Sequence, residues 1–485
     1  MTRGAKRARN ITVNEYDFPK NPEGESESSF PARRLEQLRR QVDAGIERPN
    51  SWRLDQLNGL LRFVHDHEDA MLSALKADLG RCPAEARIAD ISMVRSEIRL
   101  MRRNLRRWMQ PRAVRTPLAA QPGRSWVQVE AFGLVLIIGS WNYPFQQILL
   151  PLAGALAAGN AAVVKLPESA PHSAAIMAAE LERYVDPEAV IVVSGGPETA
   201  SRLLEFRFDK IFFTGSSAKG RMVMAAAARH LTPVTLELGG KNPVIVAEDA
   251  PLEITARRIA WGRFMNAGQL CVAPDYVLVP EALRLHLVEE IRKAIVEFYG
   301  YNAQRSESYG RIVNATHFAR LMGLMQVGRI AVGGASDEKD RYIEPTVLID
   351  LPADSAVLQE EVFGPILPVI GYERMEDALS FIRSRPKPLV FHLFSRNRAL
   401  QRRLIDQVSA GTVIVNDTLV SQIVPDLPFG GVGESGMGSF HGRYTFEAFS
   451  RSKAIVRRSF VADLAVRYPP FTAMKDRILQ WLLGD

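Results

Sequence analysis

The chain has 485 residues, and its 61 Lys and Arg against 54 Asp and Glu leave a formal net charge of +7. A content of 47% hydrophobic and 24% charged residues is typical of a globular protein and excludes a chain that is disordered or fibrous throughout. Because single hydrophobic cores stop growing at about 250–300 residues, this length predicts two or three domains of α/β size.

The first segment, residues 1–30, carries basic and then acidic side chains without an apolar run, which predicts a disordered tail rather than a signal peptide. The chain contains two cysteines, Cys82 and Cys271, too few for a disulfide framework or a cysteine metal cluster. Its eight histidines are scattered without metal-ligand spacing, so we expect no metal site. A reducing, cytoplasmic compartment fits this composition best.

Residues 31–110 have apolar positions at helical spacing, such as Leu54, Leu57 and Leu61, which predicts helices. Seven arginines and no acid lie between Arg99 and Arg115. We interpret them as the solvated face of a helix, because no nucleic-acid-binding motif accompanies them. No nucleic-acid partner is therefore expected, and a noncatalytic nucleic-acid-binding protein is the alternative from a different functional class.

From Phe132 onward, short β-branched runs alternate with Ala-rich helical stretches, which indicates βαβ units with a parallel sheet. The predicted strands of the first series cover residues 134–138, 161–164, 190–193, 210–213 and 233–236. Those of the second series cover residues 243–246, 276–279, 347–349, 367–370, 389–394 and 412–415. Two α/β domains joined near residues 236–243 are the simplest account.

Two apolar segments could suggest a membrane. The stretch from Ala131 to Val164 has no charge, but Asn, Gln and Pro interrupt it, so no integral membrane segment is expected. Near the C-terminus, one helical stripe holds Phe471, Met474, Ile478, Trp481 and Leu482. We interpret this segment as a helix that docks on the chain's own body or on a partner subunit; a membrane-surface helix is the alternative.

Glycine-rich patterns give little support for a common nucleotide motif. Gly431, Gly433 and Gly436 have the spacing of a dinucleotide fingerprint, but no strand precedes them and no βαβ unit can be fitted around them. Gly215 follows a predicted strand, and Ser216 begins the next helix. The free N–H groups there suit a pyrophosphate, and ordinary capping of the helix by Ser216 is equally consistent with this fragment.

Four side chains could together perform chemistry on a carbonyl group. Cys271 lies in a small, polar loop, where a thiolate could attack a carbonyl carbon, although a single cysteine is more often buried and inert. Glu237 ends a predicted strand beside two glycines, and Glu361 is a second acid that precedes a turn. Asn142 follows a strand and offers an amide donor for an oxyanion.

The strings NAGQLCVAPDY, LTPVTLELGGKNP, EVFGP and PFGGVGESGMG together resemble the aldehyde dehydrogenase superfamily, and its class 3 branch in particular, over about residues 35–460. That branch includes fatty-aldehyde and coniferyl-aldehyde dehydrogenases. The resemblance implies oxidation of an aldehyde to a carboxylic acid through a thiohemiacetal and a thioester on Cys271. It also implies an oxyanion hole made by Asn142 and the Cys271 N–H, with Glu237 as general base.

The same resemblance implies NAD or NADP as cofactor. Lys165 and Glu168, in VVKLPE, match the pair that holds the adenosine ribose, and Gly215 with Ser216 would lie by the pyrophosphate. Two further residues, Glu361 and Phe363, would position the nicotinamide half. The sequence leaves open which cofactor is preferred, which aldehyde is oxidised, and whether Glu237 or Glu361 activates the deacylating water.

The expected fold class is α/β, with a Rossmann-like cofactor domain, an α/β catalytic domain and a small β oligomerisation extension. We assign the cofactor domain to residues 31–112 and 132–236, and the catalytic domain to 237–433. The extension is assigned to 113–131 and 434–460, and a C-terminal amphipathic segment to 461–485. The resemblance suggests a homodimer. A CoA-acylating aldehyde dehydrogenase is the alternative activity, although Glu237 argues for water as the acyl acceptor.

Overall fold

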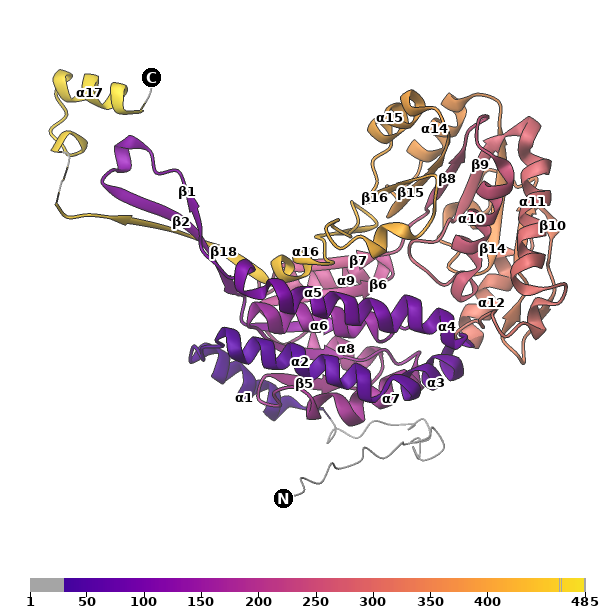
Figure 1. Cartoon of the computed structure of the whole chain (residues 1–485), viewed down its shortest axis with the longest axis horizontal. Helices are drawn as coiled ribbons and strands as arrows, with labels where there is room; N and C mark the ends of the chain where they lie inside the picture. Colours follow the sequence, from indigo (N-terminus) through magenta and orange to yellow (C-terminus); the bar gives the residue numbers. More distant parts are fainter. Residues whose placement is uncertain (1–29, 462, 464, 484–485) are drawn as a thin grey trace.

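The computed structural model describes residues 30–461, 463 and 465–483, so the tail predicted over residues 1–30 lies outside the described residues, apart from Phe30. Figure 1 shows two α/β bodies side by side and a narrow β-arm that leaves the first of them. The α/β fold class is confirmed, and the helix–strand alternation predicted from Phe132 onward is present.

The N-terminal third is helical, as its apolar periodicity predicts. Its α-helices are α1 (Ala32–Asp43), α2 (Asn50–Asp66), α3 (Glu68–Leu79), α4 (Pro83–Ala86) and α5 (Ser92–Trp108), with a π-helical turn η3 (Arg87–Ile91) before α5. On α5, Ile98, Met101 and Leu105 are buried, while Arg102 and Arg106 are exposed. The arginine run thus occupies the solvent face of a helix whose other face enters the core.

The first body is built on a six-stranded sheet with the order β17-β7-β6-β3-β4-β5. Its parallel strands are β3 (Leu134–Ile138), β4 (Ala161–Lys165), β5 (Val190–Val193), β6 (Lys210–Gly215) and β7 (Val234–Leu238). The helices between them are α6 (Gln146–Ala158), α7 (Pro171–Glu180), α8 (Pro197–Leu203) and α9 (Ser217–Ala228). Both faces of the sheet are covered, α2, α3, α5 and α6 packing on one and α1, α8 and α9 on the other.

The chain returns to this sheet near its C-terminal end. Strand β17 (Gly436–Met437) pairs antiparallel with β7, and Gly436 lies opposite Glu237. Helix α16 (Arg443–Ala448) follows, and the buried ring of Phe449 stacks on Phe212 of β6 at 5.6 Å. Residues 434–449, which the sequence analysis placed in the β-extension, instead complete the first body, because their apolar side chains fill its core.

The second body is built on a seven-stranded sheet with the order β10-β13-β14-β9-β8-β15-β16, parallel except for the edge strand β10. These strands are β8 (Pro243–Val246), β9 (Tyr276–Pro280), β10 (Arg329–Val332), β13 (Thr346–Ile349), β14 (Ile366–Tyr372), β15 (Val390–Phe394) and β16 (Thr412–Val415). The helices are α10 (Leu252–Phe264), α11 (Glu281–Tyr299), α12 (Ala315–Leu324), α13 (Ala356–Gln359), α14 (Met375–Arg383) and α15 (Arg398–Gln407), and a small ribbon joins β11 (Ser336–Asp337) to β12 (Tyr342–Ile343).

The β-arm is a three-stranded antiparallel sheet of β1 (Arg112–Val114), β2 (Gly123–Ala131) and β18 (Ser450–Arg458). Figure 1 shows it extending away from both bodies, with α17 (Ala473–Leu483) at its tip. Helix α17 contacts the short turn η4 (Leu118–Ala120) of the arm, yet Phe471, Met474 and Trp481 are 64%, 75% and 73% exposed. The apolar stripe predicted there is therefore largely uncovered within one chain.

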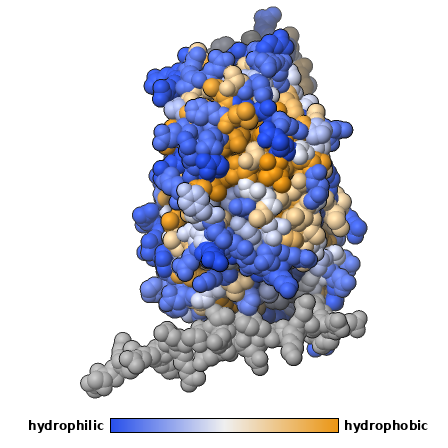
Figure 2. All heavy atoms as spheres, turned by 90° about the vertical axis from the view of Figure 1, so that its right-hand side faces the viewer, coloured by the Kyte–Doolittle hydropathy of each residue, from blue (hydrophilic) through white to orange (hydrophobic). Residues whose placement is uncertain are grey.

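The face of the second body that carries β10 and α11 is mostly hydrophilic, with an apolar area in its upper half (Figure 2). On the open edge strand β10, Arg329 forms an ion pair with Asp350 at 3.0 Å. A charged side chain on an edge strand disfavours pairing with the strands of other molecules. No helix in the described part of the chain is both long and apolar enough to cross a membrane.

Candidate active site

Cys271 lies in a loop, residues 265–275, between α10 and β9, which we call the Cys271 loop. In this loop, the backbone of three residues that precede Cys271 has positive φ: Asn266 (49°), Ala267 (50°) and Gly268 (76°). Positive φ costs energy for Asn and Ala, so other contacts must hold this backbone in place. At Gly268 a Cβ would lie 2.2 Å from the Gly364 carbonyl oxygen, so the turn packs directly on residues 361–364.

Two buried amide side chains hold the Cys271 loop. Gln269 donates from Nε2 to the carbonyls of Asn266 and Arg311, both at 2.9 Å, and its Oε1 accepts the Val313 N–H at 3.0 Å. Asn242 donates from Nδ2 to the carbonyl of Cys271 at 2.7 Å and to that of Ala273 at 3.1 Å. Sequence reasoning assigned no role to either residue, although both lie within the strings that carry the family resemblance.

Asn142 lies beside the same loop, in the segment that follows β3. Its Nδ2 donates to the Gln269 carbonyl at 3.1 Å, and its own carbonyl accepts from Asn266 Nδ2 at 3.1 Å. The side-chain amide has two N–H donors, and one of them makes this contact. The second N–H is not used in this contact.

Glu237 is near the end of β7 and is 4% exposed. Neither of its carboxylate oxygens has a hydrogen-bond partner among the described residues. Burial without a compensating donor disfavours the charged form, and it raises the pKa of Glu237 well above its ordinary value. The neutral form of this carboxyl group is therefore more favoured than that of an exposed glutamate.

Glu361 is a second carboxyl group at the site. Its Oε1 accepts the Gly240 N–H at 3.1 Å, and a Cβ added to Gly239 would lie 2.0 Å from Oε2. Glycine at position 239 is therefore required for this close approach. Burial raises the pKa of Glu361 to about 8, and the negative charge of Asp275 adds to that effect.

The Cys271 thiol experiences both carboxyl groups. Burial raises its pKa to about 12, and the charges of Glu361 and Glu237 contribute in the same direction. The N–H groups of Cys271 and Val272 oppose this effect without overcoming it. These interactions bring Cys271, Glu237 and Glu361 into one electrostatic cluster, so ionisation of one group disfavours ionisation of the others.

A buried ion cluster supports the segment that carries Glu361. Asp275 is bound by Lys241 at 2.6 Å and by Arg263 at 3.1 Å, and it accepts the Val362 N–H at 3.1 Å. Arg263 also donates to the Gly364 carbonyl. Burial lowers the pKa of both cations, while Asp275 opposes that shift. Sequence reasoning missed all three charges, because nothing in the sequence pairs residues so far apart.

Phe363, predicted to position the nicotinamide half, has a φ of 46° and is half-buried. Its ring packs edge-on against Trp141 at 5.4 Å, and Trp141 immediately precedes Asn142. The structure therefore places Phe363 at the border of the cluster formed by Cys271, Glu237, Glu361 and Asn142, rather than in the interior of a core.

The other predicted cofactor residues lie at the ends of parallel strands in the first body. Lys165 ends β4 and forms an ion pair with Glu168. Burial alone would raise the pKa of Glu168, but the hydrogen bond and charge of Lys165 outweigh it and lower that pKa. Gly215 ends β6, and the Ser216 hydroxyl caps α9 by accepting the Lys219 N–H at 3.4 Å.

The ends of β3, β4, β6 and β7 meet at one edge of the sheet, since these strands are parallel neighbours. Ligands of open α/β sheets bind at the carboxyl ends of the strands. The first turn of α9 directs N–H groups and positive dipole to this edge, and Glu168 is 38% exposed there. The residues present thus fit a dinucleotide, with anion-binding N–H groups and a hydrogen-bonding carboxylate on the same edge.

A family model described as "Aldehyde dehydrogenase family" matches residues 42–455. Aldehyde dehydrogenase family 3 member H1 of Arabidopsis thaliana is 44% identical over 93% of this chain and 94% of that protein. The dimeric NADP-preferring aldehyde dehydrogenase of Canis lupus familiaris is 44% identical over 91% of this chain and 98% of its own length. Among solved structures, the substrate-bound state of Staphylococcus aureus AldH superimposes with a TM-score of 0.90 at 41% identity, and covers 93% of this chain and 99% of that one.

The raised pKa of Cys271 predicts slow, pH-dependent alkylation. Replacing Cys82 by Ser leaves Cys271 as the sole thiol, since the chain has two cysteines. We expect its rate of reaction with iodoacetamide to rise about tenfold per pH unit between about pH 7 and 10, because only the thiolate reacts. At about pH 9, where Glu361 is ionised, Glu361→Gln should accelerate the reaction. A rate that levels off below about pH 8 would contradict the electrostatic cluster.

Proposed function

Because the chain belongs to the aldehyde dehydrogenase family and oxidises aldehydes to carboxylic acids with NAD(P)⁺, we propose that Cys271 supplies the nucleophile of this reaction. The observation that carries the proposal is the arrangement around the thiol. The buried Glu237 and the half-buried Glu361 act electrostatically on Cys271, and the Asn142 amide contacts the same loop. A nucleophile, a proton acceptor and an oxyanion donor are the parts that acyl chemistry on a carbonyl group requires.

In the first step, Cys271 Sγ forms a bond to the aldehyde carbon and the carbonyl electron pair moves to oxygen. The thiol proton passes to a nearby carboxylate, because the pKa of Cys271 is too high for a stable thiolate at neutral pH. The second Asn142 N–H and the Cys271 N–H stabilise the resulting oxyanion. The contacts to Gln269 and Asn242 keep both donors in place before substrate binds.

A bound NAD(P)⁺ would supply the hydride acceptor that converts the thiohemiacetal on Cys271 into a thioester. The residues that would hold the cofactor are Lys165 and Glu168 at the adenosine ribose, and Gly215 and Ser216 at the pyrophosphate. Glu361 and Phe363 would hold the nicotinamide half against Cys271. The carboxylate of Glu168 suits the 2′-hydroxyl of NAD⁺ better than the 2′-phosphate of NADP⁺.

In the last step, water attacks the thioester carbon, the C–S bond breaks, and the acid leaves. We propose Glu237 as the base, because neither of its oxygens is hydrogen-bonded to a described residue and both can accept a proton from water. Glu361 is held by the Gly240 N–H, which suits a positioning role. The names of the similar proteins give the CoA-acylating alternative no support.

Turnover should depend on Cys271. We expect purified protein to form NADH or NADPH with aldehydes such as hexanal, dodecanal, benzaldehyde and coniferaldehyde, and Cys271→Ala to abolish it. Absorbance of the reduced nicotinamide measures the rate, and comparison of NAD⁺ with NADP⁺ ranks the cofactors. Cys82→Ser is the matched control and should retain full activity. Undiminished turnover by Cys271→Ala would remove the basis of the mechanism.

Loss of the base should separate acylation from deacylation. Glu237→Gln is expected to lower kcat by about 10²–10⁴-fold and to show a burst of one reduced nicotinamide per site, because the thioester forms and then persists. In the wild type, kcat should rise with pH, since burial raises the pKa of Glu237 and the base must be ionised. Glu253→Gln, at an exposed position, is the control. A rate loss without a burst would assign Glu237 to an earlier step.

We propose that the β-arm joins two copies of the chain. In the described part of the chain, all of β1 and most of β18 are exposed, and Val114 and Val456 are 38% and 63% exposed. A small sheet with uncovered faces is marginally stable alone, so a second copy provides the missing contacts.

We also propose a cytoplasmic location, because Cys82 and Cys271 are both free thiols and the nucleophile must stay reduced; cell fractionation tests this.

Val456→Asp should weaken the dimer. A buried carboxylate without a partner is strongly unfavourable, so we expect light scattering to show twice the mass of one chain for the wild type and a shift towards monomer for the variant. Ile254→Asp, on α10 and 41% exposed, is a matched control outside the arm. A monomeric wild type would exclude this interface.

A further inference from the structure

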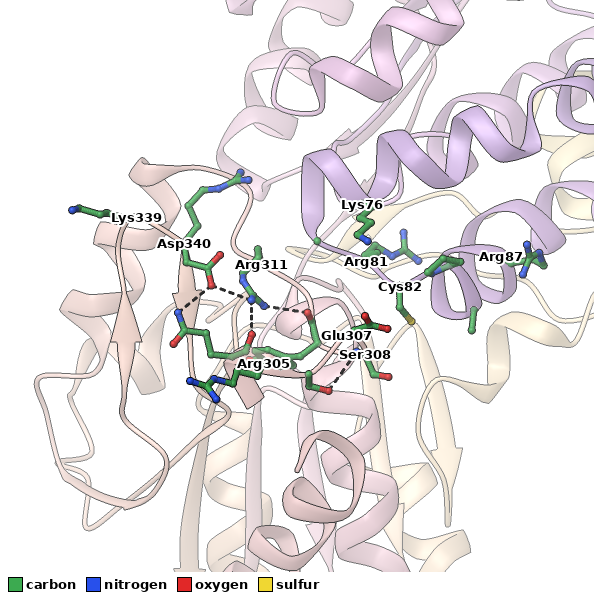
Figure 3. Close-up of a pocket in the computed structure, with 17 residues that line it drawn as sticks. Lys76, Arg81, Cys82, Arg87, Arg305, Glu307, Ser308, Arg311, Lys339 and Asp340 are labelled. Carbon is green, nitrogen blue, oxygen red and sulfur yellow. Dashed lines mark hydrogen bonds and ion pairs between the residues drawn. The ribbon is translucent and has the colours of Figure 1, made fainter. Parts of the chain in front are cut away.

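A cavity of about 820 Å³ lies at the junction of the two bodies, away from the residues assigned above. Figure 3 shows that residues of both bodies form its walls. The first body contributes Lys76 of α3 and residues 80–84 and 87, and the second contributes residues 304–309, 311 and 339–341. Pockets for small ligands have volumes of about 300–1,000 Å³, so this cavity is large enough for a metabolite.

The lining is strongly cationic. Its basic residues are Lys76, Arg81, Arg87, Arg305, Arg311, Lys339 and Arg341, and its acidic residues are Glu307 and Asp340. In the described part of the chain, Arg81 pairs with Glu85 and Asp90, Arg87 with Glu68, and Arg311 with Asp340. Within the same described part of the chain, no ion pair is formed by Lys76, Arg305, Lys339 or Arg341. The cavity therefore has a surplus of uncompensated positive charge from both bodies.

Two guanidinium groups in the lining also have unused donors. Arg81 is completely buried, and its Nη2 has no hydrogen-bond partner among the described residues. Arg311 Nε is likewise buried and unpartnered. In Figure 3, Lys76 and Arg81 lie on the α3 side of the cavity and Arg311 on the opposite side. Buried donors of this kind are rarely left unsatisfied in proteins, so the walls beneath the cavity keep hydrogen-bonding capacity that the described residues do not use.

We propose that this cavity binds a small phosphorylated metabolite with at least two negative charges. Phosphate oxygens accept hydrogen bonds from guanidinium groups in paired geometry, and a multivalent anion can reach cations of both walls at once. The hydroxyls of Ser306 and Ser308, which also line the cavity, add neutral donors. The single unpaired acid, Glu307, is exposed, so it opposes this binding only weakly.

The inner wall of the cavity is joined to both halves of the proposed oxyanion site. The Arg81 guanidinium lies 4.4 Å from the ring centre of Tyr143, the residue after Asn142. Its partner Asp90 accepts the Gln146 N–H at 2.6 Å, which fixes the start of α6. On the other wall, the Arg311 carbonyl accepts Gln269 Nε2 at 2.9 Å. An anion bound here would thus lie beside residues that support Asn142 and the Cys271 loop.

Calorimetric titration of the full chain with inorganic pyrophosphate tests the proposal. The titration is made at constant ionic strength with saturating NAD⁺, which blocks the α9 N-terminus. We expect saturable binding, weakened about tenfold or more by the Lys76→Ala/Arg305→Ala double substitution, because each change removes a charged donor. Sulfate should bind more weakly than pyrophosphate. Arg396→Ala, at an exposed position after β15 that does not line the cavity, is the control.

The conservative double substitution Lys76→Arg/Arg305→Lys should restore pyrophosphate binding. That result would show that the lost charge, rather than a change in local folding, weakens binding in the alanine double variant. Pyrophosphate affinity that is equal in the wild type and the alanine double variant would overturn the proposal. Complete loss of binding in the presence of NAD⁺ would do the same, because it would assign the anion to the cofactor site.

Discussion

The two hydrogen bonds from Asn242 to the carbonyls of Cys271 and Ala273 are the contact on which the rest of the site depends. Asn242 also accepts the Val390 N–H at 2.9 Å, so one amide joins the Cys271 loop to the central strands β8 and β15. The loop backbone is unfavourable by itself, with Asn266 and Ala267 at positive φ. Rigid sheet strands thereby determine the position of the Cys271 thiol, although Cys271 itself lies in a loop.

The charges around this site favour the protonated forms of its thiol and its two carboxyl groups. A thiol and two carboxyl groups share a region of low polarity, and no cation forms an ion pair with Glu237 or Glu361 among the described residues. The nearby cations Lys241 and Arg263 are instead committed to Asp275. This separation has a physical reason: a cation bound directly to Glu237 would lower its pKa and weaken it as a proton acceptor.

The fold of the two bodies could be predicted largely from periodicity, because the sheet of each body is buried on both faces and its strands are short β-branched runs. The predicted bounds of residues 134–138 and 412–415 agree with β3 and β16. Local strings likewise pointed to Cys271, Asn142, Glu237 and Glu361 before their proximity was known. Gln269 and Asp275 could not be assigned in this way, since hydrogen bonds from side chains to distant backbone follow no periodic pattern. For the same reason, the return of residues 436–437 to β7 was not foreseen.

That return has a consequence for synthesis on the ribosome. Glu237 belongs to β7, and one edge of this strand stays unpaired until Gly436 and Met437 have been made. The core beneath it is likewise incomplete until Phe449, which stacks on Phe212, has been added. Although the first body begins near residue 32, it cannot close before almost the whole chain has emerged. During translation, β7 is thus an exposed edge that the nascent chain, or a chaperone, must protect from pairing with other strands.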